Sequence, residues 1–267
     1  MPDLSNEYAV SPAHVAAYRE QGHVLLRGVC SPEEIEAYRT VLNNTVKRLN
    51  TEKRSLEERD TYGKAFLQTM NLWVHDEGAR QFVFARRFAK IASELMGVPA
   101  ARLYHDQALY KEPGGGHTPW HQDQHYWPLD TNNTITMWMP LVDLSPEMGI
   151  MNFASGSHTE GYLGDIPISD ESESFFENFV KEKGFSLTEP EPMRAGDATF
   201  HSGWTLHSAP GNHTDRMREV MTIIYFPDGV KVITPDNKNR QNDLDAWLPG
   251  CRGGEPAASK LNPVLFP

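Results

Sequence analysis

The apolar positions of roughly the first hundred residues recur three to four apart, which predicts a helical N-terminal part over about 11–98. Ser11-Pro12 and Ser31-Pro32 each place a capping hydroxyl before a proline suited to the first turn, so a helix is expected to begin at each pair. Between them, His23-Val24-Leu25-Leu26 is expected to form a short strand. The apolar residues of the second helix are Ile35, Tyr38, Leu42, Val46 and Leu49, and those of a third are Phe82, Ala85, Phe88, Ile91, Ala92 and Leu95, with Gly97 and Pro99 after its end.

Beyond Pro99 the pattern changes to short β-rich runs bounded by Gly, Pro, Asn or Asp. These runs predict a mainly β core, a small barrel or jelly roll, over about 99–227. Residues 161–190 are acidic, include a helix-like stretch near 175–180, and are expected to form an insertion or lid. Residues 228–267 are rich in Pro, Gly and Asn and are expected to wrap the surface. The four strand-like runs are LYHDQALYK, TITMWMPL, ATFHS and REVMTIIYF.

Composition and charge narrow the class of protein. The chain of 267 residues is 39% hydrophobic and 23% charged, so it is expected to fold as a single domain, 1–267. Its 36 acidic and 25 basic residues give a formal net charge of −11, which disfavours binding to nucleic acid or anionic membranes. Cys30 and Cys251 form no CxxC pair, and no apolar run indicates a signal peptide or a membrane span. A cytoplasmic location is therefore expected.

A metal-binding pattern follows the flexible EPGGG loop. His121-Gln122-Asp123 lies in TPWHQDQHYW, which is expected to be a strand or strand end, where residues i and i+2 point to the same face. This imidazole and this carboxylate can therefore bind one metal ion. Iron(II) oxygenases add a histidine from a distant strand, and His207 in FHSGWTLHSAPGN is the candidate. His213-Thr214-Asp215 has the same spacing but lies in a polar turn, and from spacing alone the first pair could equally be a buried histidine oriented by a carboxylate.

An arginine suited to a second ligand lies nearby in the sequence. Arg218 comes eleven residues after His207 and begins the apolar run REVMTIIYF. Its guanidinium offers a rigid fork of donors that matches a carboxylate, such as the distal carboxylate of 2-oxoglutarate. A solvated charge at a strand edge is the alternative interpretation, and Arg216 could take the same role.

Taken together, WHQDQHYWPLD, ASGSH and GDATFHSGWTLHSAPGNHTDRMRE resemble the phytanoyl-CoA dioxygenase family of iron(II)- and 2-oxoglutarate-dependent oxygenases over roughly residues 15–227. The resemblance implies a double-stranded β-helix (jelly-roll, cupin-like) core with flanking helices. It also implies activation of O2 at iron(II) as 2-oxoglutarate loses carbon dioxide. The family's metal ligands fall on His121, Asp123 and His207, and its 2-oxoglutarate-binding arginine falls on Arg218.

The resemblance also suggests residues around the co-substrate and the substrate. Trp138 matches a tryptophan beside 2-oxoglutarate, and Gln107 and Thr136 lie on neighbouring predicted strands where the family often contacts it. Alternation places Thr136 and Trp138 on one face of a strand without indicating which face is inward. The chain departs from the family at Met148-Gly149, where Asn-Gly is usual, and in ASGSH, where Pro-Gly-Ser-His is usual. Substrate contacts are expected from His125, Tyr126 and Trp127, from the lid, and from the region of Met70 to Trp73.

The expected activity is removal of a hydrogen atom from a small organic substrate, most simply leading to hydroxylation. Epimerisation, desaturation or ring closure in a biosynthetic pathway remain open. Two alternatives from other classes are a cupin-like metal-dependent isomerase or hydrolase and a non-catalytic jelly-roll binding module. The expected partner is a small-molecule substrate, with no nucleic acid and no membrane, and the sequence does not determine the oligomeric state.

Overall fold

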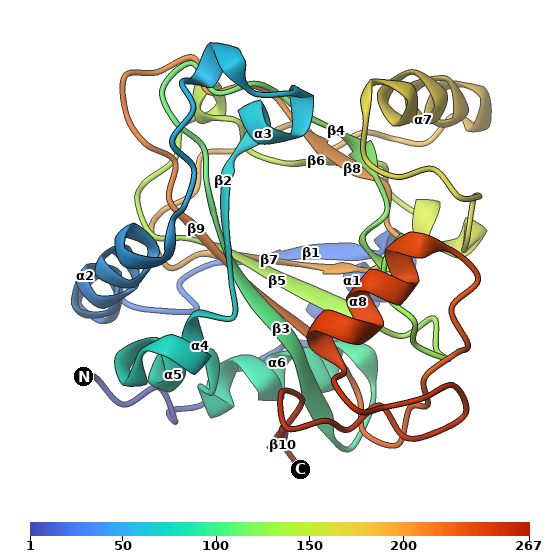
Figure 1. Cartoon of the computed structure of the whole chain (residues 1–267). Helices are drawn as coiled ribbons and strands as arrows, with labels where there is room; N and C mark the ends of the chain where they lie inside the picture. The colour runs from blue at the N-terminus through green and yellow to red at the C-terminus, as the bar shows by residue number, and fades with distance from the viewer.

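Two antiparallel β-sheets form the centre of the protein, and a computed structural model describes all residues, 1–267 (Figure 1). The larger sheet has the order β1-β7-β5-β9-β3-β10, with β2 pairing with β3, and the smaller has the order β4-β8-β6. This arrangement confirms the predicted jelly-roll core. The larger sheet contains β1 (His23–Leu26), β2 (Leu67–Met70), β3 (Ala101–Tyr110), β5 (Ile135–Pro140), β7 (Ala198–Ser202), β9 (Val220–Pro227) and β10 (Val264–Phe266), and the smaller contains β4 (Thr118–His121), β6 (Asn152–Phe153) and β8 (His207–Ala209).

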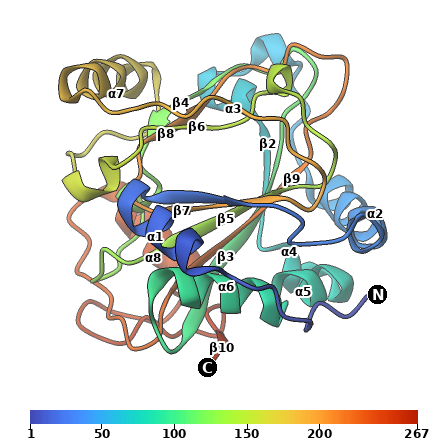
Figure 2. The same ribbon diagram turned by 180° about the vertical axis from the view of Figure 1, so that it is seen from behind.

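The helices flank the sheets. Seen from behind, α1 lies beside β1, and α6 lies below the larger sheet (Figure 2). Ser11 and Ser31 cap α1 and α2 through hydrogen bonds from the amides of His14 and Glu34, which confirms both predicted helix starts. None of the helices has the length and apolar character needed to cross a bilayer. The helices are α1 (Pro12–Gln21), α2 (Pro32–Leu49), α3 (Thr61–Ala65), α4 (Leu72–His75), α5 (Glu77–Val83), α6 (Arg86–Met96), α7 (Asp170–Lys183) and α8 (Lys238–Trp247).

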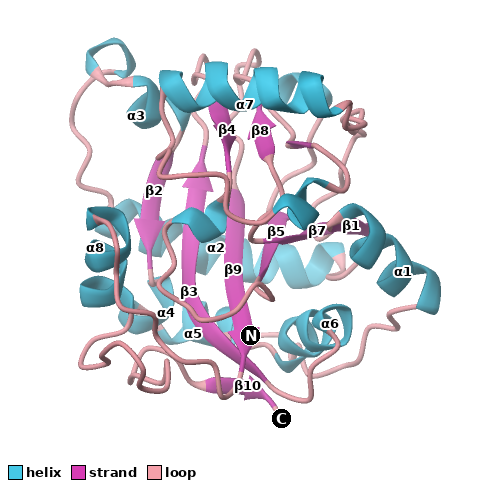
Figure 3. Ribbon diagram, turned by 90° about the vertical axis from the view of Figure 1, so that its right-hand side faces the viewer, coloured by secondary structure: helices cyan, strands magenta, loops and turns pink.

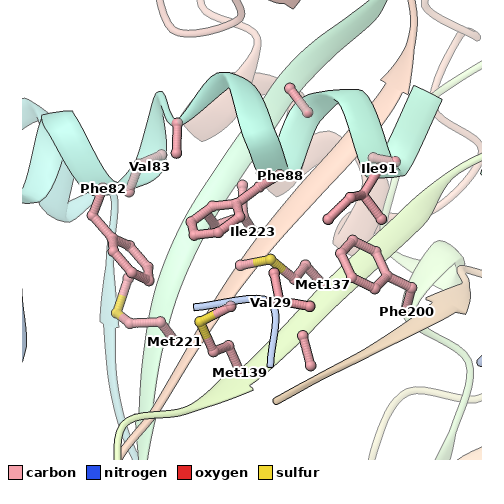
Figure 4. Packing of buried hydrophobic residues seen from close by; sticks show 14 of the residues in the cluster. Val29, Phe82, Val83, Phe88, Ile91, Met137, Met139, Phe200, Met221 and Ile223 are labelled. Atoms are coloured by element: carbon pink, nitrogen blue, oxygen red, sulfur yellow. The ribbon is translucent and has the colours of Figure 1, made fainter. Parts of the chain in front are cut away.

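The main hydrophobic core lies between the larger sheet and the helices that cover its outer face. Phe88 and Ile91 of α6 point toward Met137 of β5 and Ile223 of β9 (Figure 4), and all four side chains are fully buried. Full burial of side chains of this size stabilises a fold by about 1.5–3 kcal/mol each. The core therefore fixes the larger sheet as a rigid wall for whatever lies on its inner face.

The inner face of the larger sheet lines a cavity between the sheets. On β5, Met137 and Met139 pack in the helix-side core, whereas Thr136 and Trp138 alternate with them and line the cavity. This confirms that Thr136 and Trp138 share a face and shows that the face is inward. Because side chains alternate along a strand, β5 places polar and aromatic side chains in the cavity, and the residues next to them in the sequence pack in the core.

β3 contains an irregularity that changes which residues face the cavity. Its register against β9 shifts between Leu103 and Asp106. Before the shift, Leu103 packs in the helix-side core, whereas His105 within the shift and Gln107 after it line the cavity, and Ala108 packs in the core. A β-bulge of this kind reverses the alternation along a strand. As a result, β3 contributes an imidazole to the cavity that a regular strand would have turned away.

Two expectations about the helices and the C-terminal segment were wrong. The predicted third helix is two helices, α5 and α6, separated at Phe84 and Ala85, where Ala85 has an extended ψ of 116°. The apolar spacing continues across the break, so the pattern did not reveal it. The segment 228–267 is more than a surface wrap, because α8 supplies three residues that line the cavity and β10 extends the larger sheet.

The acidic segment contains a longer helix than the sequence indicated. The expected helical stretch near 175–180 is confirmed within α7, which lies across β4 and β8 (Figure 3). Phe176 and Val180 of α7 are buried against Trp120 and Leu206. Glu173 accepts a hydrogen bond from the backbone amide of Trp120 at 2.8 Å. α7 is therefore fixed to the smaller sheet beside the predicted metal ligands.

Candidate metal centre and active-site cavity

The three predicted metal ligands meet on the smaller sheet. His121 ends β4 and is the direct cross-strand partner of His207, the first residue of β8. Asp123 follows in a short 3-10 turn, and its Oδ1 lies 3.4 Å from His121 Nε2 and 3.6 Å from His207 Nε2. Two ligands held at right angles, about 2.1 Å from one ion, would be about 3 Å apart. The separations therefore suit a single divalent metal.

The hydrogen bonds of the two histidines fix which ring nitrogen is available. His121 Nδ1 lies 2.7 Å from the carbonyl oxygen of Pro119, and His207 Nδ1 lies 3.0 Å from that of Thr205. A carbonyl oxygen only accepts, so each Nδ1 carries the proton and each Nε2 presents its lone pair toward Asp123. Burial and the neighbouring His121 hold the pKa of His207 well below its ordinary value. This neutral tautomer is the form that binds a metal.

Two further side chains hold the carboxylate of Asp123. The hydroxyl of Thr136 donates to Asp123 Oδ2 at 3.0 Å, and His201 Nε2 lies 3.2 Å from the same oxygen. Oδ1 is thereby left facing the two ligand histidines. His201 on β7 is buried and was not identified from the sequence, although its cross-strand pairing with Thr136 places it beside the centre. Thr136 was predicted to contact 2-oxoglutarate, but its hydroxyl orients Asp123.

Thr136→Val is expected to lower iron(II) affinity roughly 10- to 100-fold, the usual cost of losing a group that orients a metal ligand. The change keeps the side-chain shape and removes only the hydrogen bond to Asp123. Anaerobic iron(II) titration measures the effect. Thr222→Val is the matched control, because the Thr222 hydroxyl also lies in the cavity but donates to the Gln107 carbonyl. Equal iron affinities for both variants would show that the hydroxyl does not position Asp123.

Arg218 reaches the cavity as a buried cation without a carboxylate partner. The residue is 2% exposed, and no acidic group lies within ion-pairing distance of it. Its Nη1 donates to the Gly149 carbonyl at 2.5 Å, and its Nε has no hydrogen-bond partner. Its guanidinium lies 5.5 Å from the centre of the Trp138 ring. Arg216, the alternative, is exposed.

Lys111 is a second buried basic residue beside Arg218 and was also missed from the sequence. It is fully buried, and its ammonium group donates to the Gly116 carbonyl and to Thr118 Oγ1, both uncharged. Burial, with the charge of Arg218 adding to it, lowers the pKa of Lys111 to about 6. With that pKa the Lys111 amine is mostly uncharged at neutral pH, which avoids placing two buried cations side by side without an acidic partner. A carboxylate bound at Arg218 would favour the protonated form of Lys111, which makes the pair suited to an anion.

Gly149 forms the turn that supports Arg218. Its φ is +82°, and a Cβ there would lie 2.4 Å from the Pro210 carbonyl oxygen, so only glycine fits. The departure from the family at Met148-Gly149 therefore keeps the residue that the geometry requires. The Met148 side chain, where the family usually has Asn, is buried in the hydrophobic cluster that includes Trp138 and Val220.

The cavity has a volume of about 450 Å³ and contains the ligand set at one side. Trp138, Gln107, Tyr126 and Trp127 line it as expected, and the Gln107 side chain accepts a hydrogen bond from Gln68 at 2.5 Å. His125 does not line it, because its ring points toward Asp165, 3.5 Å away. The rival triplet is outside the site: His213 and Asp215 are exposed in a turn, as its polar composition indicated.

The family model described as phytanoyl-CoA dioxygenase (PhyH) matches residues 18–220. A curated relative, the methylphosphonate hydroxylase of Gimesia maris, is 31% identical over 151 residues, which are 55% of this chain and 54% of that protein. The chain thus matches about half the length of this relative.

Solved structures resemble nearly the whole chain. The non-heme alpha ketoglutarate dependent carbocyclase SnoK from nogalamycin biosynthesis superposes with a TM-score of 0.76 at 25% identity, covering 96% of each chain. The epimerase SnoN, solved in complex with Fe3+, alpha ketoglutarate and nogalamycin RO, superposes with a TM-score of 0.75 at 27% identity, covering 95% of this chain and 97% of that one.

Proposed function

The chain belongs to the phytanoyl-CoA dioxygenase family, and on that premise we propose that His121, Asp123 and His207 hold iron(II) for the 2-oxoglutarate-dependent oxidation of a small organic molecule. The enzyme is a non-haem dioxygenase whose cofactors are iron(II), 2-oxoglutarate and O2. The observation that carries the assignment is the donor set itself. Two neutral imidazoles and one carboxylate on one face of a metal ion leave the opposite face open.

The residues present fit both iron and 2-oxoglutarate. When bound, iron(II) supplies the activation of O2 that accompanies decarboxylation of 2-oxoglutarate to succinate. The protein fixes the coordination through the His121 and His207 tautomers and through the Thr136 hydroxyl on Asp123. Arg218 binds the distal carboxylate, because its buried guanidinium has free donors and no acidic partner.

Lys111 and Trp138 are both neighbours of Arg218, and Trp138 lines the cavity. A carboxylate bound at Arg218 would favour the charged form of the Lys111 amine, and the Trp138 ring lies 5.5 Å from the guanidinium. Gln107 lies on the cavity wall with its side chain engaged by Gln68, so we assign it to the shape of the wall and to a contact with substrate. Water is excluded from the anchor by its burial, which strengthens each charged hydrogen bond.

Hydroxylation is the reaction we propose first, with epimerisation, desaturation and ring closure as outcomes set by how the substrate lies over the metal. The relatives are named for a hydroxylation, a ring closure and an epimerisation, so the shared centre accommodates more than one outcome. Tyr126 and Trp127 lie on the cavity wall and are the proposed substrate contacts.

The direct test is release of succinate from 2-oxoglutarate by the iron-loaded protein, with and without candidate substrates. We expect slow release alone and faster release with the authentic substrate, whose product mass then identifies the reaction. An addition of one oxygen atom indicates hydroxylation, a loss of two hydrogens indicates desaturation or ring closure, and an unchanged mass indicates epimerisation. No succinate with any substrate would favour a cupin-like isomerase or hydrolase, and absence of bound metal would favour a binding module.

Ile168→Ala tests whether the acidic segment acts as a lid over the substrate. Pro167 and Ile168 line the cavity, and the Ile168 amide donates to the Tyr126 hydroxyl at 2.8 Å. Removing the Ile168 side chain is expected to raise the substrate KM roughly three- to thirtyfold through lost apolar contact, with the 2-oxoglutarate requirement unchanged. Ile166→Ala is the control, because Ile166 packs in the cluster beneath α7 instead. Unchanged substrate kinetics in the first variant would remove the proposed lid.

A further inference from the structure

The cavity wall carries an uneven distribution of charge. Of its 26 lining residues, Arg218 is the only lysine or arginine. Its guanidinium is committed to the co-substrate under the proposed function. His105 also lines the cavity, but burial lowers its pKa to about 3, so this imidazole is neutral. The space left for a substrate therefore contains no cation that could pair with a phosphonate, phosphate or carboxylate.

A carboxylate faces this same space. Asp243 of α8 lines the cavity, and its Oδ2 accepts a hydrogen bond from Tyr104 at 2.9 Å, but no lysine, arginine or histidine pairs with it. Burial raises its pKa to about 7 against the hydrogen bonds it accepts. Burial likewise raises the pKa of Tyr62 and Tyr126 on the cavity wall, and the charges of both Asp123 and Asp243 add to each shift. The negative charges of two carboxylates, Asp123 and Asp243, thus affect groups on the wall of the same cavity.

His105 gives an independent indication of a polar ligand. It is 4% exposed, it lines the cavity, and its buried Nδ1 has no hydrogen-bond partner in the protein. Buried polar groups are nearly always paired, so an unpaired one on a cavity wall indicates a group supplied by a ligand. Its ring lies 5.3 Å from that of Trp247, which belongs to α8, as does Asp243.

The rest of this wall is aromatic. Phe66, Tyr62, Tyr126 and Trp247 also line the cavity. Aromatic side chains prefer to stack against flat rings, and a cavity of about 450 Å³ is of the size that accepts drug-sized ligands. These walls favour a ring system over a small anion such as a phosphonate.

Charges near the cavity also disfavour an anionic substrate. Asp165 and Asp170 flank the lining residues Pro167 and Ile168 in the acidic segment. The nearby guanidinium of Arg240 is already paired with Asp236 at 2.9 Å. The protein as a whole has a formal net charge of −11, which repels polyanions such as an acyl-CoA during approach.

We propose that the substrate is a ring-bearing molecule with a protonated amine, which pairs with Asp243 while the ring lies against the aromatic wall. His105 hydrogen-bonds an oxygen substituent of the same molecule. This inference rests on the proposed function for its orientation toward the metal but names a substrate class that the family does not specify. It excludes methylphosphonate, the substrate in the name of the Gimesia maris relative, and acyl-CoA thioesters.

Matched probes test the proposal without turnover. An anthraquinone ring carries an aminomethyl, a hydroxymethyl or a carboxylate group at the same position, and binding is followed by quenching of tryptophan fluorescence, since Trp127, Trp138 and Trp247 line the cavity. The protein is loaded with iron(II) and saturated with 2-oxoglutarate under anaerobic conditions, so that Arg218 is occupied. At about pH 8 both the Asp243 carboxylate and the amine are ionised.

The amine probe is expected to bind roughly ten- to a hundredfold more tightly than the hydroxymethyl probe, with the carboxylate weakest. Asp243→Asn should bring the first two probes to similar affinity, and Asp243→Lys should favour the carboxylate. Asp245→Asn is the control, because Asp245 lies on the exposed face of the same helix and should keep the wild-type order.

Equal affinity of wild type for the amine and carboxylate probes, an unchanged order in Asp243→Asn, or binding of none of the probes would overturn the proposal. Saturable 2-oxoglutarate binding by each variant shows that it is folded. Succinate release is measured separately, so failure of the oxygenase assignment and failure of the amine assignment are distinguishable.

Discussion

Asp123→Ala is expected to abolish iron binding and iron-dependent turnover. The carboxylate is the only charged member of the ligand set, and its Oδ1 lies within 3.6 Å of both ligand nitrogens. Losing a group that merely orients a ligand costs about 10- to 100-fold in metal affinity, so losing the ligand should cost more than roughly a hundredfold. Metal analysis of the purified variant and succinate release at saturating 2-oxoglutarate measure the two effects.

Asp215→Ala is the matched control for the same substitution in the same His-x-Asp spacing. Asp215 is exposed in a turn, so its loss should leave iron content and turnover near those of the wild type. Iron retained after the first change and lost after the second would contradict the ligand assignment. Asp123→Glu adds a further comparison, because it keeps the charge but lengthens the side chain and should retain part of the iron.

Arg218→Ala is expected to raise the apparent 2-oxoglutarate requirement by roughly one to three orders of magnitude, with iron content little changed. Charge-assisted hydrogen bonds in a dry site contribute about 1.5–3 kcal/mol each, and every 1.4 kcal/mol corresponds to a factor of about ten. Arg218 is 2% exposed, so its contact with the carboxylate is shielded from bulk water and correspondingly strong. Succinate release as a function of 2-oxoglutarate concentration measures the change.

Arg216→Ala separates this contact from a general effect of charge. Arg216 lies two residues away on the surface and should behave as the wild type. If Arg216→Ala produced the large effect and Arg218→Ala did not, the anchor would belong to Arg216. If both variants kept the wild-type requirement, 2-oxoglutarate would bind elsewhere, and Lys111 would be the first residue to test.

The grouping of the three proposed metal ligands was predictable from the sequence because it depends on local geometry and on a specific set of residue types. An extended chain places His121 and Asp123 on one side, and the motif around His207 indicated the third candidate, which the structure brings beside them. Lys111 and His201 were not predictable in this way. Each is an ordinary strand residue in the sequence, and only pairing with Arg218 or Thr136 brings it to the site.

The fold was predictable where the local sequence pattern agrees with the tertiary packing. The capping serines predicted the starts of two helices, and strand alternation predicted that Thr136 and Trp138 share one face. Alternation alone would not have placed His105 in the cavity, because the bulge in β3 reverses which residues face inward and no proline or glycine marks it in the sequence. The contribution of Asp243 was missed for another reason: α8 has a weakly amphipathic sequence in a segment rich in turn-forming residues, and tertiary packing decides that it is a helix.

Because His121 and His207 pair across two strands, a metal ion bound by both would stabilise the smaller sheet. Its strands are only four, three and two residues long, so few backbone hydrogen bonds hold it together. Under the proposed assignment, an ion bound by both histidines would link two segments that lie 86 residues apart in the chain, as the positions 121 and 207 imply. Because an ion that binds only the native pairing stabilises it by mass action, a higher iron concentration would raise the stability of the folded enzyme as well as its activity.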